Sequence, residues 1–288
     1  MKIKYPRMQK GKAVNSFISL TGIFIIICIL LMPVYLFIES LPLFRELNPV
    51  DLFTGSWEVS DNKYGIKNFL VTSLIIASLA TVLSLVISLG LALYMHNYKS
   101  RRTGQFLNDI IRFMTGIPTV VYGFAGIVLL IPFMKKYTES PSGLCLATVI
   151  IVLSILILPT ITIYIHSSFN MVNKKNIMTA LSLGASQEQL YLHVIIPSSL
   201  RGIAIAAILG FSRAISDTMV PLMLSGNSLH LPKSLFMSGR SLTAHIAMEL
   251  PGEYNGLEFR IIFFVGLILI ALVILFNIIV YYMERLND

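Results

Sequence analysis

The sequence predicts an all-α integral membrane protein with six transmembrane helices, and three observations support this. Hydrophobic residues make up 56% of the 288 residues and charged residues only 12%, whereas soluble domains carry about 25% charged residues. The charged residues cluster between long apolar segments. Each of these segments approaches or exceeds the roughly 20 residues that a helix needs to cross a bilayer. This composition excludes a soluble enzyme.

The predicted spans follow one another along the chain. The first span, 16–38, is too long and lacks the small-residue cleavage site of a signal peptide, so we expect it to be retained. Long segments at 39–67, 166–202 and 226–258 interrupt the series of spans. The other five spans are predicted at 68–95, 110–134, 144–165, 203–225 and 259–283.

The basic residues predict the orientation. Short loops rich in Lys and Arg stay in the cytoplasm, and several basic residues precede the first span. We therefore predict a multi-pass cell-membrane protein, embedded in lipid, with both termini cytoplasmic. The net charge of +8 is better explained by this orientation than by nucleic-acid binding, because no basic stripe with interleaved aromatics is present. The predicted parts are a tail over 1–15, an external loop over 39–67, a core over 68–283 and a tail over 284–288.

A helix–turn–helix pattern occupies the segment between the fourth and fifth spans. Residues 177–183 favour a helix that ends at Gly184, and Ser186 with Gln189 forms a capping box that begins a second helix before Pro197. We expect one apolar face of these helices to lie against a partner or the bilayer surface. That face consists of Ile177, Leu181, Leu190 and Val194.

This pattern resembles the coupling segment of ABC importer permeases, which reads Glu-Ala-Ala, three residues, Gly, nine residues, Ile-x-Leu-Pro. Gly184 and Pro197 match that spacing, whereas Met178 and Thr179 stand where the family usually has Glu and Ala. The resemblance implies that residues 171–197 dock on an ATPase subunit, although an amphipathic helix resting on the membrane is the alternative. The expected contact residues are Thr179, Ala180, Gly184, Ala185 and Pro197.

Two charged residues lie inside the fifth predicted span. A charge at bilayer depth costs at least about 2.5 kcal/mol, so Arg213 and Asp217 need a partner or a wet cavity. Spaced by four residues on one helix, they are expected to share a face, with Asp217 accepting a hydrogen bond from Arg213. The remaining guanidinium donors suit a tetrahedral oxyanion, and Asp217 would favour a proton-donating anion such as monohydrogen phosphate over sulfate. The alternative is a structural pair with no ligand role.

The segment 210–227 resembles the Gly-Arg-Ala-Ile-Gly-Glu-Thr-Met motif of phosphate-specific ABC permeases. Arg213 matches that motif, and Asp217 stands where the family has Glu. The segment 116–123 resembles the same family's Gly-Ile-Pro-Ser-Val-Val-Tyr-Gly element. The resemblance implies a type I ABC importer permease fold with a cytoplasmic coupling helix.

The same resemblance implies residue roles. Arg213, Asp217 and Thr218 are expected along the substrate pathway. Gly116, Pro118 and Tyr122 are expected in the pathway or in packing, with Pro118 kinking the helix and the glycines allowing close approach.

The family also implies partners. These are a second permease subunit, a dimer of ABC ATPase subunits that bind ATP and Mg, and an extracytoplasmic phosphate-binding protein that delivers phosphate. No cofactor, metal or catalytic residue is expected on this chain. The segment 239–249 resembles the family's external Leu-Thr-Ala-His-Ile-Ala element, and we expect a surface helix there that contacts the binding protein. His245 and Glu249 alone are weak evidence for a metal site.

Other functions stay open. The long first loop resembles the C-type phosphate permease more than its A-type partner, and sulfate or molybdate would suit the same residues. The chain could also be an ATP-independent, ion-coupled transporter, in which Arg213 and Asp217 would form a proton or ion relay. A membrane-embedded enzyme is disfavoured, because the sequence has no zinc-protease, nucleophile-elbow or phosphate-loop motif.

Overall fold

The computed structural model describes residues 11–58, 61, 63–97, 102–138, 140–250 and 256–285. The expected tails, including the basic residues up to Lys10, therefore lie largely outside the described residues. Five helices are long and apolar enough to cross a membrane, or six if a bent pair, 187–198 and 200–216, is one span. The five are residues 14–46, which include most of α1 (Gly11–Ser40), α4 (Lys67–Asn97), residues 119–137, α8 (Leu146–Met171) and α15 (Leu257–Arg285). The second arm of the bent pair is α12 (Leu200–Ser216).

The third and fifth predicted spans are broken rather than continuous. Helix α12 ends at Ser216, and a short α13 (Met219–Leu224) follows it. The third span divides into α5 (Arg102–Thr115), α6 (Thr119–Ala125), the π-helical turn η2 (Gly126–Leu130) and α7 (Ile131–Tyr137). The predicted spans over 110–134 and 203–225 therefore each contain a break in the helix.

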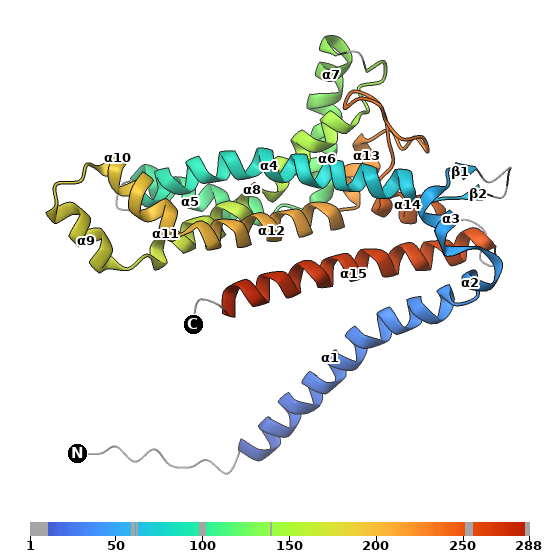
Figure 1. Cartoon of the computed structure of the whole chain (residues 1–288), viewed down its shortest axis with the longest axis horizontal. Helices are drawn as coiled ribbons and strands as arrows, with labels where there is room; N and C mark the ends of the chain where they lie inside the picture. The colour runs from blue at the N-terminus through green and yellow to red at the C-terminus, as the bar shows by residue number, and fades with distance from the viewer. Residues whose placement is uncertain are drawn as a thin grey trace.

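Helices α4, α8 and α12 form the packed centre of the molecule and run alongside one another (Figure 1). A β-carbon on Gly210 would lie only 2.5 Å from Ile161 Cδ1, so the glycine at this position lets α12 approach α8 closely. Helix α15 packs on α12, whereas α1 contacts α15 near its own C-terminal end, where Tyr35 meets Phe263, and diverges from it farther along (Figure 1). Most side chains of α1 are exposed in the single chain.

The described residues of the segment 43–66 (43–58, 61 and 63–66) and α14 (Leu242–Glu249) form a small folded unit at one end of the molecule, which we call the cap (Figure 1). Its core includes Leu43, Trp57, Phe69 and Leu242, all buried. The expected open loop over 39–67 is therefore folded. It contains α2 (Leu43–Glu46), α3 (Pro49–Thr54) and two antiparallel strands, β1 (Trp57–Glu58) and β2 (Lys63–Tyr64).

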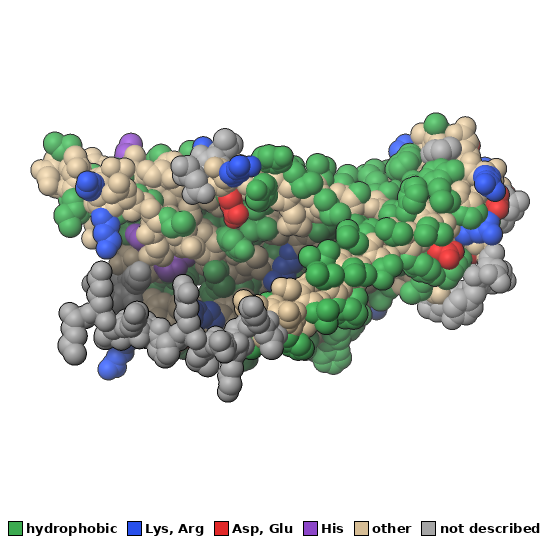
Figure 2. All heavy atoms as spheres, turned by 90° about the horizontal axis from the view of Figure 1, so that it is seen from below, with side chains coloured by type: hydrophobic (Ala, Val, Ile, Leu, Met, Phe, Trp, Pro, Cys, Tyr) green, Lys and Arg blue, Asp and Glu red, His purple; other side chains and the backbone are tan. Residues whose placement is uncertain are grey.

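The opposite end of the molecule carries the helix–turn–helix segment (Figure 1). We call this part the coupling segment. A broad hydrophobic zone covers the surface between the cap and the middle of the molecule, whereas basic and histidine side chains lie toward the coupling segment (Figure 2). The segment comprises α9 (Lys174–Ser182), α10 (Gln187–Leu190), the π-helical turn η3 (Tyr191–Ile195) and α11 (Ile196–Ser198).

Candidate translocation site and coupling segment

A proline causes the break in the third span. Pro118 has no N–H to donate to the carbonyl of Met114, four residues earlier, and its ring would clash with that carbonyl in a helix. Helix α5 accordingly ends at Thr115. The Tyr122 hydroxyl donates a hydrogen bond to Met114 O at 3.0 Å. Tyr122 thus joins α6 to the end of α5, and the expected kink is a full break.

The break in the fifth span follows the same logic. Pro221 cannot donate to the carbonyl of Asp217, and α12 ends one residue earlier, at Ser216. The Thr243 hydroxyl, from α14 of the cap, donates to Asp217 O at 2.8 Å. A side chain thereby satisfies the backbone group that the proline leaves without its helical partner, as membrane spans require.

Arg213 lies in the last turn of α12, where its Nη1 donates to Thr160 Oγ1 of α8 at 2.9 Å. The expected hydrogen bond to Asp217 does not form, and no ion pair joins these two described side chains. Asp217 has an extended backbone (φ −72°, ψ 130°), so the four-residue spacing no longer places both residues on one helix face. The Asp217 carboxylate instead accepts from Val220 N at 2.9 Å and caps α13.

The structure brings together the two segments that resemble the phosphate-permease motifs, because α6 packs directly on α13. A β-carbon on Gly123 would lie 2.6 Å from Met223 Sδ, which confirms the expected close approach. For Gly116 the nearest atom is Phe113 O at 3.5 Å, an ordinary contact. Gly116 therefore lies at the break between α5 and α6 and does not bring two helices into close contact.

Thr218 belongs to the wall of another space. It lines an apolar cavity of about 580 Å³ between α12, α14, α15 and α1, together with Ser216 and Thr243. A pathway role for Thr218 stays a prediction, as do the pathway roles of Arg213 and Asp217.

Sequence reasoning missed Thr160. The available signal is a hydroxyl that follows Pro159 in an apolar span, and Ser154 and Thr162 in the same span offer the same signal. Its pairing with Arg213 spans 53 positions and depends on the packing of α8 against α12, so spacing along the chain does not reveal it.

The coupling segment has the predicted turn. Gly184 has φ +81°, a left-handed conformation that favours glycine. Its N–H bonds Leu181 O at 3.0 Å, and Ala185 N–H bonds Ala180 O at 3.1 Å. These two bonds form a Schellman motif at the end of α9, which gives Ala180, Gly184 and Ala185 a structural role.

The second helix of the segment begins with the predicted capping box. The Ser186 hydroxyl accepts from Gln189 N at 3.3 Å, and the Gln189 side chain accepts from Ser186 N at 2.9 Å. Thr179 and Pro197 are exposed in the single chain, as a partner contact requires. That contact itself stays a prediction.

The expected apolar face of this segment is only partly correct. Ile177, Leu190 and Val194 pack against the chain's own core, and of the four predicted residues only Leu181 is exposed. Leu183, at the turn, is 83% exposed. Three of the four predicted residues therefore anchor the segment to the chain's own core. The apolar side chains that point outward are Leu181 and three others. That set is Met178, Leu181, Leu183 and Leu192.

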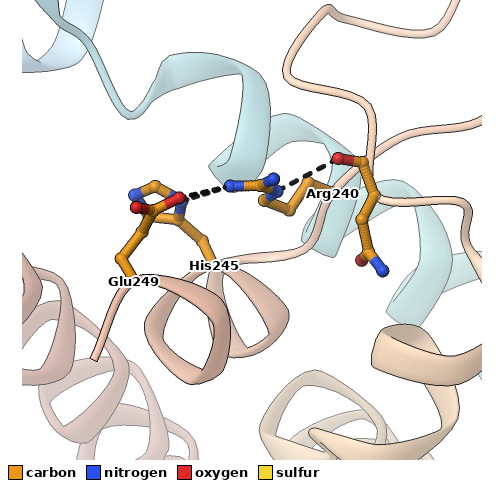
Figure 3. Close-up of polar contacts among 4 residues, drawn as sticks. Arg240, His245 and Glu249 are labelled. Atoms are coloured by element: carbon orange, nitrogen blue, oxygen red, sulfur yellow. Dashed lines mark hydrogen bonds and ion pairs between the residues drawn. The ribbon is translucent and has the colours of Figure 1, made fainter. Parts of the chain in front are cut away.

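The segment 239–249 is not the surface helix that was expected. Arg240 links three parts of the cap end (Figure 3): its Nη1 bonds Glu249 Oε1 at 2.7 Å and His245 Nδ1 at 3.3 Å, and its Nε donates to Asn227 O at 3.1 Å. The imidazole of His245 is fully buried. It stacks on Phe69 and meets the Trp57 ring edge to face, with ring centroids 4.1 and 4.3 Å away.

Burial, reinforced by the charge of Arg240, lowers the pKa of His245 from 6.5 to about 3. His245 is therefore neutral at pH 7. Because arginine only donates, Nδ1 accepts and Nε2 carries the proton. Within the described ranges, no three His, Cys, Asp or Glu side chains gather closely enough to hold a metal.

Comparisons with known proteins agree with this geometry. Residues 84–288 match the family described as "Binding-protein-dependent transport system inner membrane component". The chain is 28% identical over 246 residues to the probable ABC transporter permease protein YqgH of Bacillus subtilis, covering 84% of this chain and 80% of that protein. It is 27% identical over 237 residues to the phosphate transport system permease protein PstC of Pasteurella multocida, covering 76% and 74%.

A solved structure shares the fold. A chain of a bacterial alginate ABC transporter, solved in complex with an alginate-bound periplasmic protein, superposes with a TM-score of 0.66 at 13% identity, covering 97% of this chain and 98% of that one. The family match covers well over half of the chain. The chain therefore belongs to the binding-protein-dependent transport system inner membrane components, and it is a permease subunit of a type I ABC importer.

Proposed function

We propose that this chain is the transmembrane permease subunit of an ATP-driven phosphate importer. One observation supports an anionic substrate above the others. The only side-chain hydrogen bond that Arg213 makes with the described residues goes to the neutral hydroxyl of Thr160. The guanidinium thus keeps its charge and most of its donors inside the packed bundle, where intramembrane charge usually serves a ligand or an ion.

Phosphate is the proposed oxyanion for two reasons. The phosphate permease of Pasteurella multocida is among the relatives. Asp217 accepts from Val220 N with Oδ2, and its other carboxylate oxygen bonds no described residue. A monohydrogen phosphate could donate its proton to the other carboxylate oxygen, whereas sulfate has no proton to donate.

We propose further that the coupling segment docks on a separate ATPase subunit that binds ATP and Mg. The exposed Leu183 and its neighbours would enter a groove of that subunit, because so much exposed apolar surface on a helical turn needs a cover. The cap would then face an extracytoplasmic phosphate-binding protein, with both termini cytoplasmic. A second permease subunit would complete the pathway.

Flux in proteoliposomes tests the proposal. The chain would be reconstituted with its partner permease and ATPase, and ATP-dependent uptake of labelled phosphate measured with sulfate and molybdate as competitors. We expect uptake that requires ATP and is insensitive to sulfate. ATP-dependent flux of another oxyanion would contradict phosphate as the substrate but would leave the proposed importer architecture in place. ATP-independent flux would contradict the proposal as a whole.

Arg213→Gln is the decisive variant, because it keeps a polar side chain for Thr160 and removes the charge. We expect uptake to fall by about 10- to 100-fold, since a lost hydrogen bond to a charged group is worth about 1.5–3 kcal/mol. Arg260→Gln is the matched control, since Arg260 pairs with Glu46 at the surface of the cap. Normal uptake by Arg213→Gln at normal protein level would remove Arg213 from the mechanism.

A further inference from the structure

A polar cavity, distinct from the apolar cavity beside Thr218, lies near the coupling segment. Its volume is about 530 Å³, and it opens between α4, α5 and α8 near the ends that approach the coupling segment. Arg112 is the one permanently charged residue of its lining, which contains no Asp or Glu. The lining residues are Met95, Gln105, Asn108, Arg112, Ile163, His166, Ser167 and Asn170.

Helical spacing explains why polar groups converge here. Gln105, Asn108 and Arg112 are three and four residues apart on α5 and therefore share one face. Ser167 and Asn170 form the corresponding face of α8, which packs on α5. Two amphipathic faces thus place amide, hydroxyl and guanidinium groups around one space.

Four of these side chains have no side-chain partner among the described residues. Gln105, Asn108, Arg112 and Ser167 make no side-chain hydrogen bond or ion pair with any residue that the structure describes. Asp109 lies three residues before Arg112 but does not come within ion-pair distance of it. A cation and several donors therefore face a cavity roomy enough for an anion with some of its water, since one water occupies about 30 Å³.

The cavity is aligned with the proposed pathway. Thr160, the partner of Arg213, and Ser167, on the cavity wall, are seven residues apart on α8. Seven residues are two turns, so both lie near one face of the helix, about 10 Å apart along its axis. Arg213, through Thr160, and the cavity of Arg112, through Ser167, thus lie beside the same face of α8.

We propose that this cavity is a second oxyanion site, in which Arg112 pairs with a phosphate group and Asn108, Gln105 and Ser167 donate hydrogen bonds to it. Two sources have this chemistry: inorganic phosphate leaving Arg213 and the phosphate of a lipid headgroup. The inorganic source rests on the proposed function. The site itself does not, because it is defined by its own donors.

Protection of an introduced thiol tests the site directly. Cys28 and Cys145 are the native cysteines, so Ser167→Cys would be made in a Cys28→Ser, Cys145→Ser chain. The complete transporter would be placed in nanodiscs of zwitterionic lipid, and the rate of maleimide labelling measured against inorganic phosphate. At ten times its dissociation constant, phosphate should slow labelling about tenfold. A parallel sample in anionic phosphatidylglycerol without phosphate tests the headgroup.

Variants make the outcome specific. Arg112→Gln should abolish protection, Arg112→Lys should retain part of it, and Arg102→Gln, on the same helix but outside the lining, should leave it unchanged. Protection by anionic lipid alone would assign the site to a headgroup. Labelling that responds to neither phosphate nor anionic lipid, or protection that survives Arg112→Gln, would overturn the proposal.

The test is separable from the flux experiment. If Arg213→Gln leaves uptake normal while phosphate still protects residue 167, the translocation proposal fails and the second site stands. If flux follows the proposed function but Arg112→Gln changes neither protection nor uptake, only the second site fails.

Discussion

The cap and the coupling segment show opposite ways of ending a helical bundle. At the cap end, Arg240 bonds both His245 and Glu249 beneath aromatic rings and donates to the backbone carbonyl of Asn227. Nε2 of His245 is buried and bonds no described residue. In the coupling segment, the hydrogen bonds are local, within a Schellman turn and a capping box. Large apolar side chains there remain exposed.

This difference indicates where each part obtains its stability. The cap packs against its own chain, through contacts between residues far apart in the sequence. The turn and the capping box of the coupling segment form from local signals, and its outward surface carries large exposed apolar side chains. Changes in the cap should therefore alter stability, and changes at the outward surface of the coupling segment should alter assembly.

Removing Arg240 should have the largest effect on stability. Its side chain is only 9% exposed, and Arg240→Ala would leave Glu249 without its cation and Asn227 O without its donor. Loss of one partner of a buried ion pair costs about 3–5 kcal/mol, so we expect a clear fall in the melting temperature of the nanodisc-embedded chain. Arg260→Ala is the matched control, because its pair with Glu46 is more exposed and should cost less than about 1 kcal/mol. Equal losses in the two variants would contradict the comparison.

Acid should destabilise the cap next most strongly. His245 has a pKa of about 3 in the folded chain and 6.5 as its ordinary value, so the unfolded chain binds a proton at a pH where the folded chain does not. Stability should therefore fall as pH drops from about 6.5 toward 3, by on the order of 3 kcal/mol between pH 7 and pH 4. Unfolding measured across that range should show a weaker pH dependence in His245→Phe, which keeps an aromatic ring beside Phe69. If the stability of His245→Phe fell with pH as steeply as that of the unchanged chain, titration of other groups would cause the loss of stability in acid.

The two ends also differ in how far the sequence predicts them. The turn at Gly184 and the capping box of Ser186 and Gln189 were predicted correctly, because their signals lie within a few residues. The buried position of His245 was missed, since its neighbours Trp57 and Phe69 come from a distant part of the chain.

The candidate translocation site falls between these cases. Arg213 was found from its charge in an apolar span, but its partner Thr160 was not, because helix packing selects it. The expected pairing with Asp217 failed for a local reason that the sequence does contain: Pro221 stands four residues after Asp217 and ends the helix before it. Most spans were predicted from hydropathy, and the two breaks required attention to proline.

A smaller effect is expected at the turn of the coupling segment. Gly184→Ala would force a side chain into φ +81°, at a cost of about 1 kcal/mol. Hydrogen exchange of the Gly184 and Ala185 amides should accelerate about fivefold, because opening of the Schellman turn becomes easier by that free energy. Gly90→Ala is the control, since Gly90 lies within α4 at a helical φ and a β-carbon there meets nothing within 4 Å. If the exchange rates of these two amides were unchanged in Gly184→Ala, the stability of the turn would not depend on a glycine at this position.

The smallest effect on stability, and the sharpest on assembly, is expected at Leu183. Its side chain is 83% exposed, so Leu183→Gln should change the free energy of unfolding by less than about 0.5 kcal/mol. If the exposed apolar side chains serve a partner, the same variant should reduce recovery of the ATPase subunit with the purified permease. Val50→Gln, at an exposed apolar position of the cap, should leave that recovery unchanged. If Leu183→Gln lowered the stability of the permease and left ATPase recovery normal, the comparison would be contradicted. Leu183 would then stabilise its own chain, as the buried residues of the cap do, and would not serve a partner.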